Sequence, residues 1–212
     1  MNIYNVIILD ESGSMSSLYD QALSGMNEVL SGIRKNREEF PDQTHFVTLV
    51  TFEGEGISGV KTRIDRAAIE DIQDLTQKDY CPGGCTPLYD AMGKTLNTMD
   101  SQIQESDRVM VTIITDGYEN SSREYSGKTV KELVGRLRKK GWTFAYIGAN
   151  QDAVEVAKEL DINNALNYEA TATGFCEMSV KLRSARDRFV HFCKATESCK
   201  APTEMADLFD ED

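Results

Sequence analysis

The sequence lacks any hydrophobic run long enough to cross a membrane. Spanning a bilayer takes about 20 consecutive apolar residues, and no stretch of the 212-residue chain approaches that length. The first ten residues, MNIYNVIILD, contain no basic side chain, and their apolar run from Val6 to Leu9 is too short for the core of a secretory signal. From these absences we expect a cytoplasmic protein with no membrane partner.

Positive charge is also scarce. The chain has 23 Lys and Arg against 35 Asp and Glu, which gives a formal net charge of -12. Such a balance repels the phosphates of nucleic acids and the surface of anionic membranes, so we expect neither as a partner. It suits a protein that attracts cations or basic partners.

Motifs of two common enzyme classes are missing. The chain has no G-x-x-x-x-G-K-[ST] segment, which excludes a P-loop nucleotide hydrolase, and no G-x-S-x-G segment. Its two histidines, His45 and His191, have no ligand-like neighbours and no plausible place in a catalytic triad. A serine hydrolase is therefore not expected.

The cysteines are odd in number and have no export signal to accompany them, so we expect reduced thiols. Cys81 and Cys85 flank a glycine-rich loop, where a redox switch or a metal clip is conceivable. Thiols without a further role are the simpler interpretation. The five cysteines are Cys81, Cys85, Cys176, Cys193 and Cys199.

Apolar segments of two kinds alternate along the chain. Short, β-branched runs predict strands buried on both faces, and runs with apolar residues at helical spacing predict helices. The expected strands are 3–9, 46–52, 57–64, 108–115, 142–147 and 165–168. The expected helices are 18–33, 67–75, 88–99, 130–137, 153–160 and 175–192.

This alternation predicts an α/β fold with a doubly wound, mostly parallel six-stranded sheet and helices on both faces. The segment 57–64 follows its predecessor so closely that we expect it to be antiparallel and at an edge. Residues 1–195 would form the domain, and 196–212 a mobile acidic tail. Met205, Leu208 and Phe209 in that tail could instead dock on a partner.

Oxygen-bearing side chains gather where two strands are expected to end. Asp10 closes the first strand and is followed by Ser12 and Ser14, Asp116 follows the strand 108–115, and Thr86 stands in the loop CPGGCTP. If the two strands are neighbours, the two carboxylates meet and need a cation or a proton between them. An all-oxygen set suits Mg²⁺ best, with Mn²⁺ or Ca²⁺ possible, and does not suit zinc or copper.

Three segments carry a resemblance to a known family. The run 10–14, DESGS, resembles the D-x-S-x-S motif of the metal-ion-dependent adhesion site in von Willebrand factor A domains. The runs 84–88, GCTPL, and 115–117, TDG, are similar to that family's threonine loop and final aspartate. Motif order, spacing and the strand–helix pattern agree over roughly residues 1 to 170, as in an intracellular bacterial member.

The resemblance implies a protein-binding role. Ser12, Ser14 and Thr86 would touch the metal, Asp10 and Asp116 would bind mostly through water, and one position would take a carboxylate from a partner protein. Members of this type often work beside AAA+ ATPases. The expected partner-binding rim consists of Glu11, Gly13, Gly84, Cys85, Gly117, Tyr118 and Glu119.

Other interpretations remain open. Taken singly, the serines are typical of a strand-to-helix turn, Thr86 of a helix N-cap, and Asp116-Gly117 of a simple turn. A metal-dependent phosphatase using Asp10 as nucleophile is an alternative, although that chemistry usually wants an acid where this chain has Ser12. A structural subunit with an unused site is a third.

Overall fold

One six-stranded sheet runs through the protein in the order β3-β2-β1-β4-β5-β6, and only β3 is antiparallel to its neighbour. The computed structural model describes residues 1–149, 152–197 and 203–209. The strands are β1 (Asn2–Asp10), β2 (Thr44–Phe52), β3 (Val60–Ala68), β4 (Arg108–Thr115), β5 (Thr143–Ala149) and β6 (Asn164–Tyr168). The predicted sheet with its antiparallel edge strand is confirmed.

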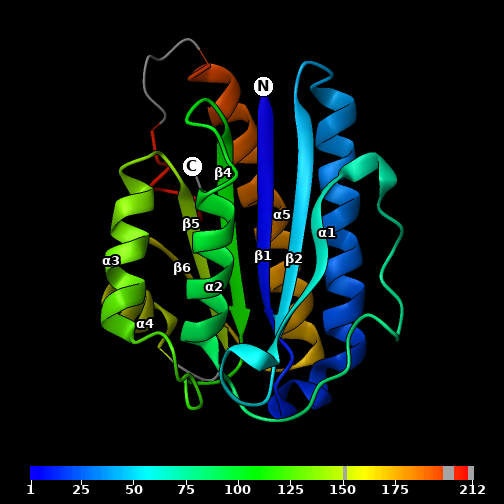
Figure 1. Cartoon of the computed structure of the whole chain (residues 1–212). Coiled ribbons are helices and arrows are strands. Elements are labelled where there is room, and N and C mark those ends of the chain that lie inside the picture. Colours follow the sequence, from blue (N-terminus) through cyan, green and yellow to red (C-terminus); the bar gives the residue numbers. More distant parts are fainter. Residues whose placement is uncertain (150–151, 198–202, 210–212) are drawn as a thin grey trace.

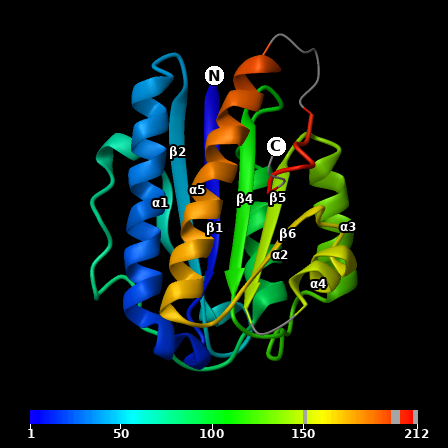
Figure 2. The same cartoon turned by 180° about the vertical axis from the view of Figure 1, so that it is seen from behind.

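Helices cover both faces of this sheet. Figure 1 shows α2, α3 and α4 on one face, and Figure 2 shows α1 and α5 side by side on the other. Among the described residues, no helix is long and apolar enough to cross a membrane. The helices are α1 (Tyr19–Glu39), α2 (Leu88–Asp100), α3 (Gly127–Arg138), α4 (Ala153–Glu159) and α5 (Ala172–Ala195).

The two-sided burial of the central strands follows from their continuous apolar sequence. In β1, Ile7 and Leu9 pack towards α1 and α5, whereas Val6 and Ile8 pack towards α2 and α3. Side chains alternate between the faces of a strand, so a strand with helices on both faces needs apolar residues at nearly every position. The long apolar runs in β1 and β4 follow from this two-sided burial.

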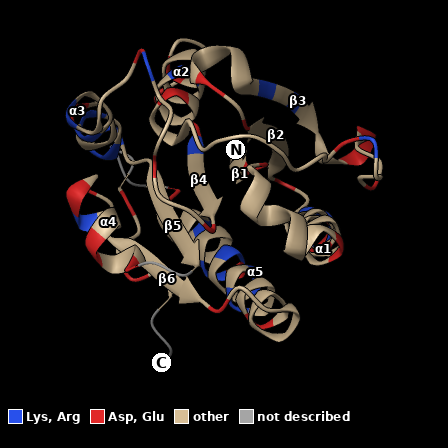
Figure 3. Cartoon of the chain, turned by 90° about the horizontal axis from the view of Figure 1, so that it is seen from below, with Lys and Arg blue, Asp and Glu red and all other residues tan. Residues whose placement is uncertain are grey.

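The strand order reverses between β1 and β4. After β1 the chain crosses to β2 on one side, and β4 later pairs with β1 on the other side. The connections that leave β1 and β4 therefore diverge, which opens a crevice beyond the carboxyl ends of these strands, where ligands of such folds bind. Figure 3 views the molecule from this end of the sheet.

The helix predicted over 67–75 is wrong. Strand β3 continues to Ala68, and only a single 3₁₀ turn follows, over Ile69–Asp71. The remaining segment is held by side chains of α1: Arg34 donates to the carbonyl of Ile72, and Asn27 bonds both backbone groups of Leu75. Backbone groups satisfied in this way need no helix.

The segment 203–209, which belongs to the expected acidic tail, lies against the domain. Leu208 is fully buried, its backbone amide donates to Asn164, and its carbonyl accepts from Arg188. Glu204 forms an ion pair with Arg138. The apolar side chains of this segment pack on this chain's own core. Residues 198–202 and 210–212 of the expected tail lie outside the described residues.

Candidate functional site

Asp10 ends β1 at the crevice and is held in one orientation. Its side chain is fully buried; Oδ1 accepts a hydrogen bond from the backbone amide of Ser12 at 2.7 Å, and Oδ2 accepts one from the hydroxyl of Thr115 at 2.6 Å. Its backbone carbonyl accepts the hydroxyl of Tyr80 at 2.7 Å. These bonds link the end of β1 to the end of β4 and to the loop before Thr86.

The two serines connect this loop to the second carboxylate. The hydroxyl oxygens of Ser12 and Ser14 lie 3.1 Å apart, and Ser14 Oγ donates to Asp116 Oδ1 at 2.6 Å. The alternate serines thus face the same side of a 3₁₀ turn over Gly13–Leu18, in which the chain turns from β1 into α1. Two carboxylates and two hydroxyls share this end of the sheet.

Thr86 enters the same space from a third loop. A Cβ atom placed on Gly117 would lie 3.6 Å from Thr86 Oγ1 and 3.9 Å from Ser14 Oγ, so both hydroxyls border the space next to Gly117. Asn120 holds the backbone of Thr86 through two hydrogen bonds. The backbone amide of Thr86 donates to Asn120 Oδ1, and the backbone amide of Asn120 donates to the carbonyl of Thr86. The structure therefore brings all five predicted side chains together.

Burial makes the two carboxyl groups hard to ionise. It raises the pKa of Asp10 to about 6, with a further contribution from the charge of Asp116, while hydrogen bonds from Thr115 and Ser12 act in the opposite direction. Burial also raises the pKa of Asp116. Neighbouring buried carboxylates of this kind are stabilised by a cation between them.

The donor set fits a hard divalent cation. The site gathers two carboxylates and three hydroxyls, all oxygen donors, and the hydroxyls of Thr86 and Ser14 border a space that a single methyl group on Gly117 would enter. Magnesium takes one or two carboxylates and fills its remaining positions with neutral oxygens, including water. Among the described residues, no three His, Cys, Asp or Glu side chains gather as metal ligands, so the hydroxyls are essential to such a site.

Glu11 does not lie on the rim where the sequence placed it. Its side chain is fully buried and forms an ion pair with Arg63. The predicted rim residue Glu119 is half-buried, and its carboxylate accepts hydrogen bonds from Tyr89, Ser121 and Ser122. Both acids hold loops in place. Of the other predicted rim residues, Tyr118, Gly13, Gly84 and Cys85 are exposed, and Gly117 is half-buried.

Three residues of the site were not singled out from the sequence. Thr115 could have been, because it directly precedes Asp116 and is a polar residue at the end of a buried strand. Tyr80 and Asn120 offered no signal, because their roles depend on which loops meet in the folded protein.

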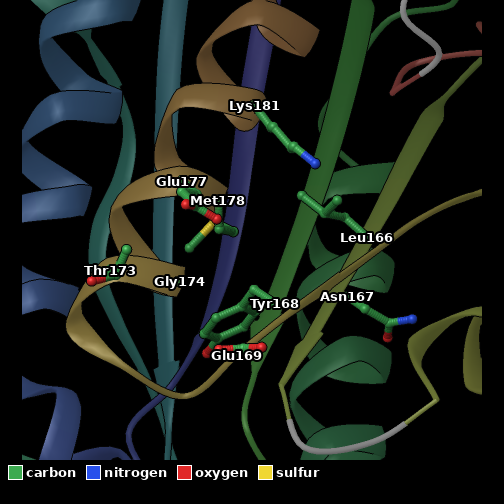
Figure 4. A pocket seen from close by; sticks show the side chains of 9 residues that line it. All are labelled: Leu166, Asn167, Tyr168, Glu169, Thr173, Gly174, Glu177, Met178 and Lys181. Atoms are coloured by element: carbon green, nitrogen blue, oxygen red, sulfur yellow. The ribbon is translucent and has the colours of Figure 1, made fainter.

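Two hollows lie near this end of the sheet. One, of about 470 Å³, adjoins the predicted site and is lined by aromatic and acidic side chains that include Tyr118, Glu119 and Glu155. The other, of about 350 Å³, lies between β6 and α5 and is shown in Figure 4. Its lining includes Glu177 and Lys181 but none of the five predicted metal ligands.

The fold and the position of these loops define an α/β protein with a polar site at the point where the strand order reverses. The sequence model of the von Willebrand factor type A domain matches residues 6–175. The chain therefore belongs to the von Willebrand factor type A domain family. No curated protein sequence matches the chain.

Solved structures share the fold at low sequence identity. The pilus adhesin SpaC of Lactobacillus rhamnosus GG is 12% identical, with a TM-score of 0.65, over 89% of this chain and 30% of its own. The PilB minor pilin of Streptococcus sanguinis is 13% identical, with a TM-score of 0.61, over 91% and 63%. The ArnB paralog VWA2 of Sulfolobus acidocaldarius is 15% identical, with a TM-score of 0.53, over 86% and 44%. The chain thus spans less than two thirds of each of these proteins.

Proposed function

We propose that this domain binds a protein partner through a divalent cation, with Mg²⁺ preferred and Mn²⁺ or Ca²⁺ as substitutes. The observation that carries the proposal is the convergence of two buried carboxylates and three hydroxyls from separate loops. Ser12, Ser14 and Thr86 would hold the cation directly, and Asp10 and Asp116 mostly through water.

The bound cation would supply an electrophilic centre that attracts an anionic group of the partner. Because the three direct ligands are neutral hydroxyls and the two carboxylates act mostly through water, the cation stays electrophilic, and an Asp or Glu of the partner completes the site. The exposed Tyr118 beside the site would contact the partner surface around that acid. Aromatic residues at such positions contribute much of the binding energy in protein interfaces.

The family supports an interaction role over catalysis. Domains of this family generally act as interaction modules, and one structural neighbour, SpaC, is a pilus adhesin. We propose that this chain is not an enzyme and works in the cytoplasm, with a component of an AAA+ ATPase system as a candidate partner. We do not propose nucleic acids or membranes as partners, because the net charge of -12 disfavours both.

Calorimetry with Mg²⁺ and Mn²⁺ tests the site. Thr86→Val keeps the shape of the side chain but removes the hydroxyl, so it should weaken cation binding, whereas Thr86→Ser keeps the hydroxyl and should bind. Asp10→Asn should also lose binding, and Asp74→Asn, on an exposed acid away from the site, serves as its control. Equal affinity in Thr86→Val and wild type would refute the proposed ligand set.

Partner capture tests the bridging role. A partner retained by the wild-type domain in Mg²⁺ should be released by EDTA and should not bind Asp10→Asn. A partner that stays bound in EDTA would contradict a cation bridge. An aryl phosphatase activity lost in Asp10→Asn would instead favour the enzyme alternative, and a domain that binds no cation would favour a structural subunit.

A further inference from the structure

The side chain of Glu11 occupies an unusual place for an acid in a loop. It stands between Asp10 and Ser12, yet it points into the protein and has no exposed surface. Both of its carboxylate oxygens lie 2.9 Å from Nη2 of Arg63, and Oε1 also accepts the backbone amide of Cys81 at 2.5 Å. A buried carboxylate is tolerated only with partners of this kind.

Arg63 is fixed from the other side. It belongs to the edge strand β3, its side chain is 23% exposed, and its Nε donates to Thr51 Oγ1 on β2 at 2.9 Å. The guanidinium is therefore bonded to the sheet through Nε and to Glu11 through Nη2. An arginine anchored in this way presents its remaining donors in a set direction.

The backbone of Glu11 joins the same segments. Its amide donates to the carbonyl of Phe52 at the end of β2, and its carbonyl accepts the amide of Gly83 at 2.8 Å. Gly13, two residues on, donates to the carbonyl of Gly84 at 3.1 Å. The loop that carries the two serines is thus bound to the loop that leads into Thr86, and the Glu11 carboxylate is the charged part of that junction.

We propose that Glu11 and Arg63 are positioning residues, which hold the 81–86 loop against the 10–14 loop so that Thr86 faces Ser12 and Ser14 before a cation binds. The inference rests on the proposed function, because it concerns the same cation site. Neither residue would touch the cation. Their effect on cation affinity would come from keeping the hydroxyls of two separate loops together.

The geometry makes a neutral replacement at Glu11 a stringent test. Glu11 accepts from two different donors, Arg63 and the amide of Cys81, and also carries the charge that balances the guanidinium. Glutamine has one acceptor oxygen, and its amide nitrogen would face another donor. Outer residues that orient metal ligands typically change metal affinity by roughly 10–100-fold when replaced, and we expect Glu11→Gln to fall in this range.

Two measurements on the full chain test the proposal. The first is the affinity for Mg²⁺ and Mn²⁺ by calorimetry, and the second is hydrogen exchange at the backbone amides of residues 81 and 83–86 in metal-free protein. Glu11→Gln and Arg63→Met should bind more weakly and exchange faster, and Arg63→Lys, which keeps the charge, should retain more affinity than Arg63→Met. Arg66→Met, on the same strand but paired with the exposed Asp65, is the matched control.

The outcomes separate this inference from the proposed function. Wild-type affinity and exchange in Glu11→Gln and Arg63→Met would overturn the inference, as would an equal loss in Arg66→Met. If Glu11→Gln does not fold, Arg63→Met and Arg63→Lys, at a partly exposed side chain, still test the inference. If the wild-type protein binds no cation, the proposed function fails. Exchange in the 81–86 loop then decides the inference: faster exchange in the two variants supports the positioning role, and unchanged exchange overturns it.

Discussion

Acid should remove the contribution that one buried, neutral histidine makes to the stability of this domain. His45 on β2 is 1% exposed, and its Nε2 lies 3.2 Å from Gln43 Oε1. Burial, together with the positive charges of Arg37 and Arg186, lowers its pKa from 6.5 to about 4, while Glu70 acts in the opposite sense. The folded protein therefore holds this imidazole neutral at a pH where the unfolded chain protonates it.

The sign and size of the effect follow from this difference. Between pH 6.5 and 4 the unfolded state binds the extra proton, so the contribution of His45 to stability falls as the pH is lowered through that range and changes no further below it. At pH 4.5 the lost stability amounts to about 2.5 kcal/mol relative to neutral pH, from about 1.4 kcal/mol for each pKa unit. This is a large part of the stability of a typical domain.

Urea unfolding of wild type and His45→Gln at pH 7 and pH 4.5 measures this contribution. The variant should be less stable than wild type at pH 7, and the difference should shrink by about 2 kcal/mol at pH 4.5. The comparison between variants is needed because Asp10, whose pKa is raised to about 6, changes stability in the opposite direction over this range. His191→Gln, at a 63% exposed side chain, is the control. A difference that stays constant with pH would refute the reasoning.

Further predictions concern the loops and the C-terminal segment. Gly84→Ala should destabilise the domain by at least about 1–2 kcal/mol, because the φ angle of this residue is +67° and the new Cβ would lie 2.7 Å from the amide nitrogen of Gly54. Thermal unfolding measures this loss, and Gly83→Ala is the control because its new Cβ would meet no atom within 4 Å. Gly117→Ala should leave thermal stability nearly unchanged but weaken Mg²⁺ binding in calorimetry, since its methyl group enters the space beside two site hydroxyls; unchanged affinity would contradict the proposed cation position. Leu208→Ala should cost about 2–5 kcal/mol in urea unfolding, and a loss below about 0.5 kcal/mol would show that the segment 203–209 contributes little to the core.

Much of the fold could be predicted because strands buried on both faces leave a clear trace in the sequence. The run 108–115 reads as a buried strand without any knowledge of its neighbours, and the structure gives β4 the same bounds. The segment 67–75 was harder, because its apolar residues suit both a short helix and an extended run. Hydrogen bonds from Asn27 and Arg34 on α1 decide between the two, and local spacing does not show them.

The candidate site was predictable in part for the same reason. Asp10 and Asp116 stand at the ends of recognisable strands, and the turn residues around them mark loops. The burial of the Glu11 side chain was not predictable, since a charged residue in a short loop is usually exposed. Only the meeting of β3 with the loop before Thr86 provides the arginine and the amide that allow it to be buried.

The sequence by itself determined the order of the elements, the two-sided burial of the central strands and the positions of the oxygen-bearing loops, because periodicity and turn chemistry act over a few neighbouring residues. The tertiary structure decided which side chains meet. The bond from Thr115 to Asp10 spans 105 positions, that from Arg63 to Glu11 spans 52, and that from Asn164 to the C-terminal segment spans 41. Contacts of this range depend on strand order and register, which are set only when the whole sheet has formed.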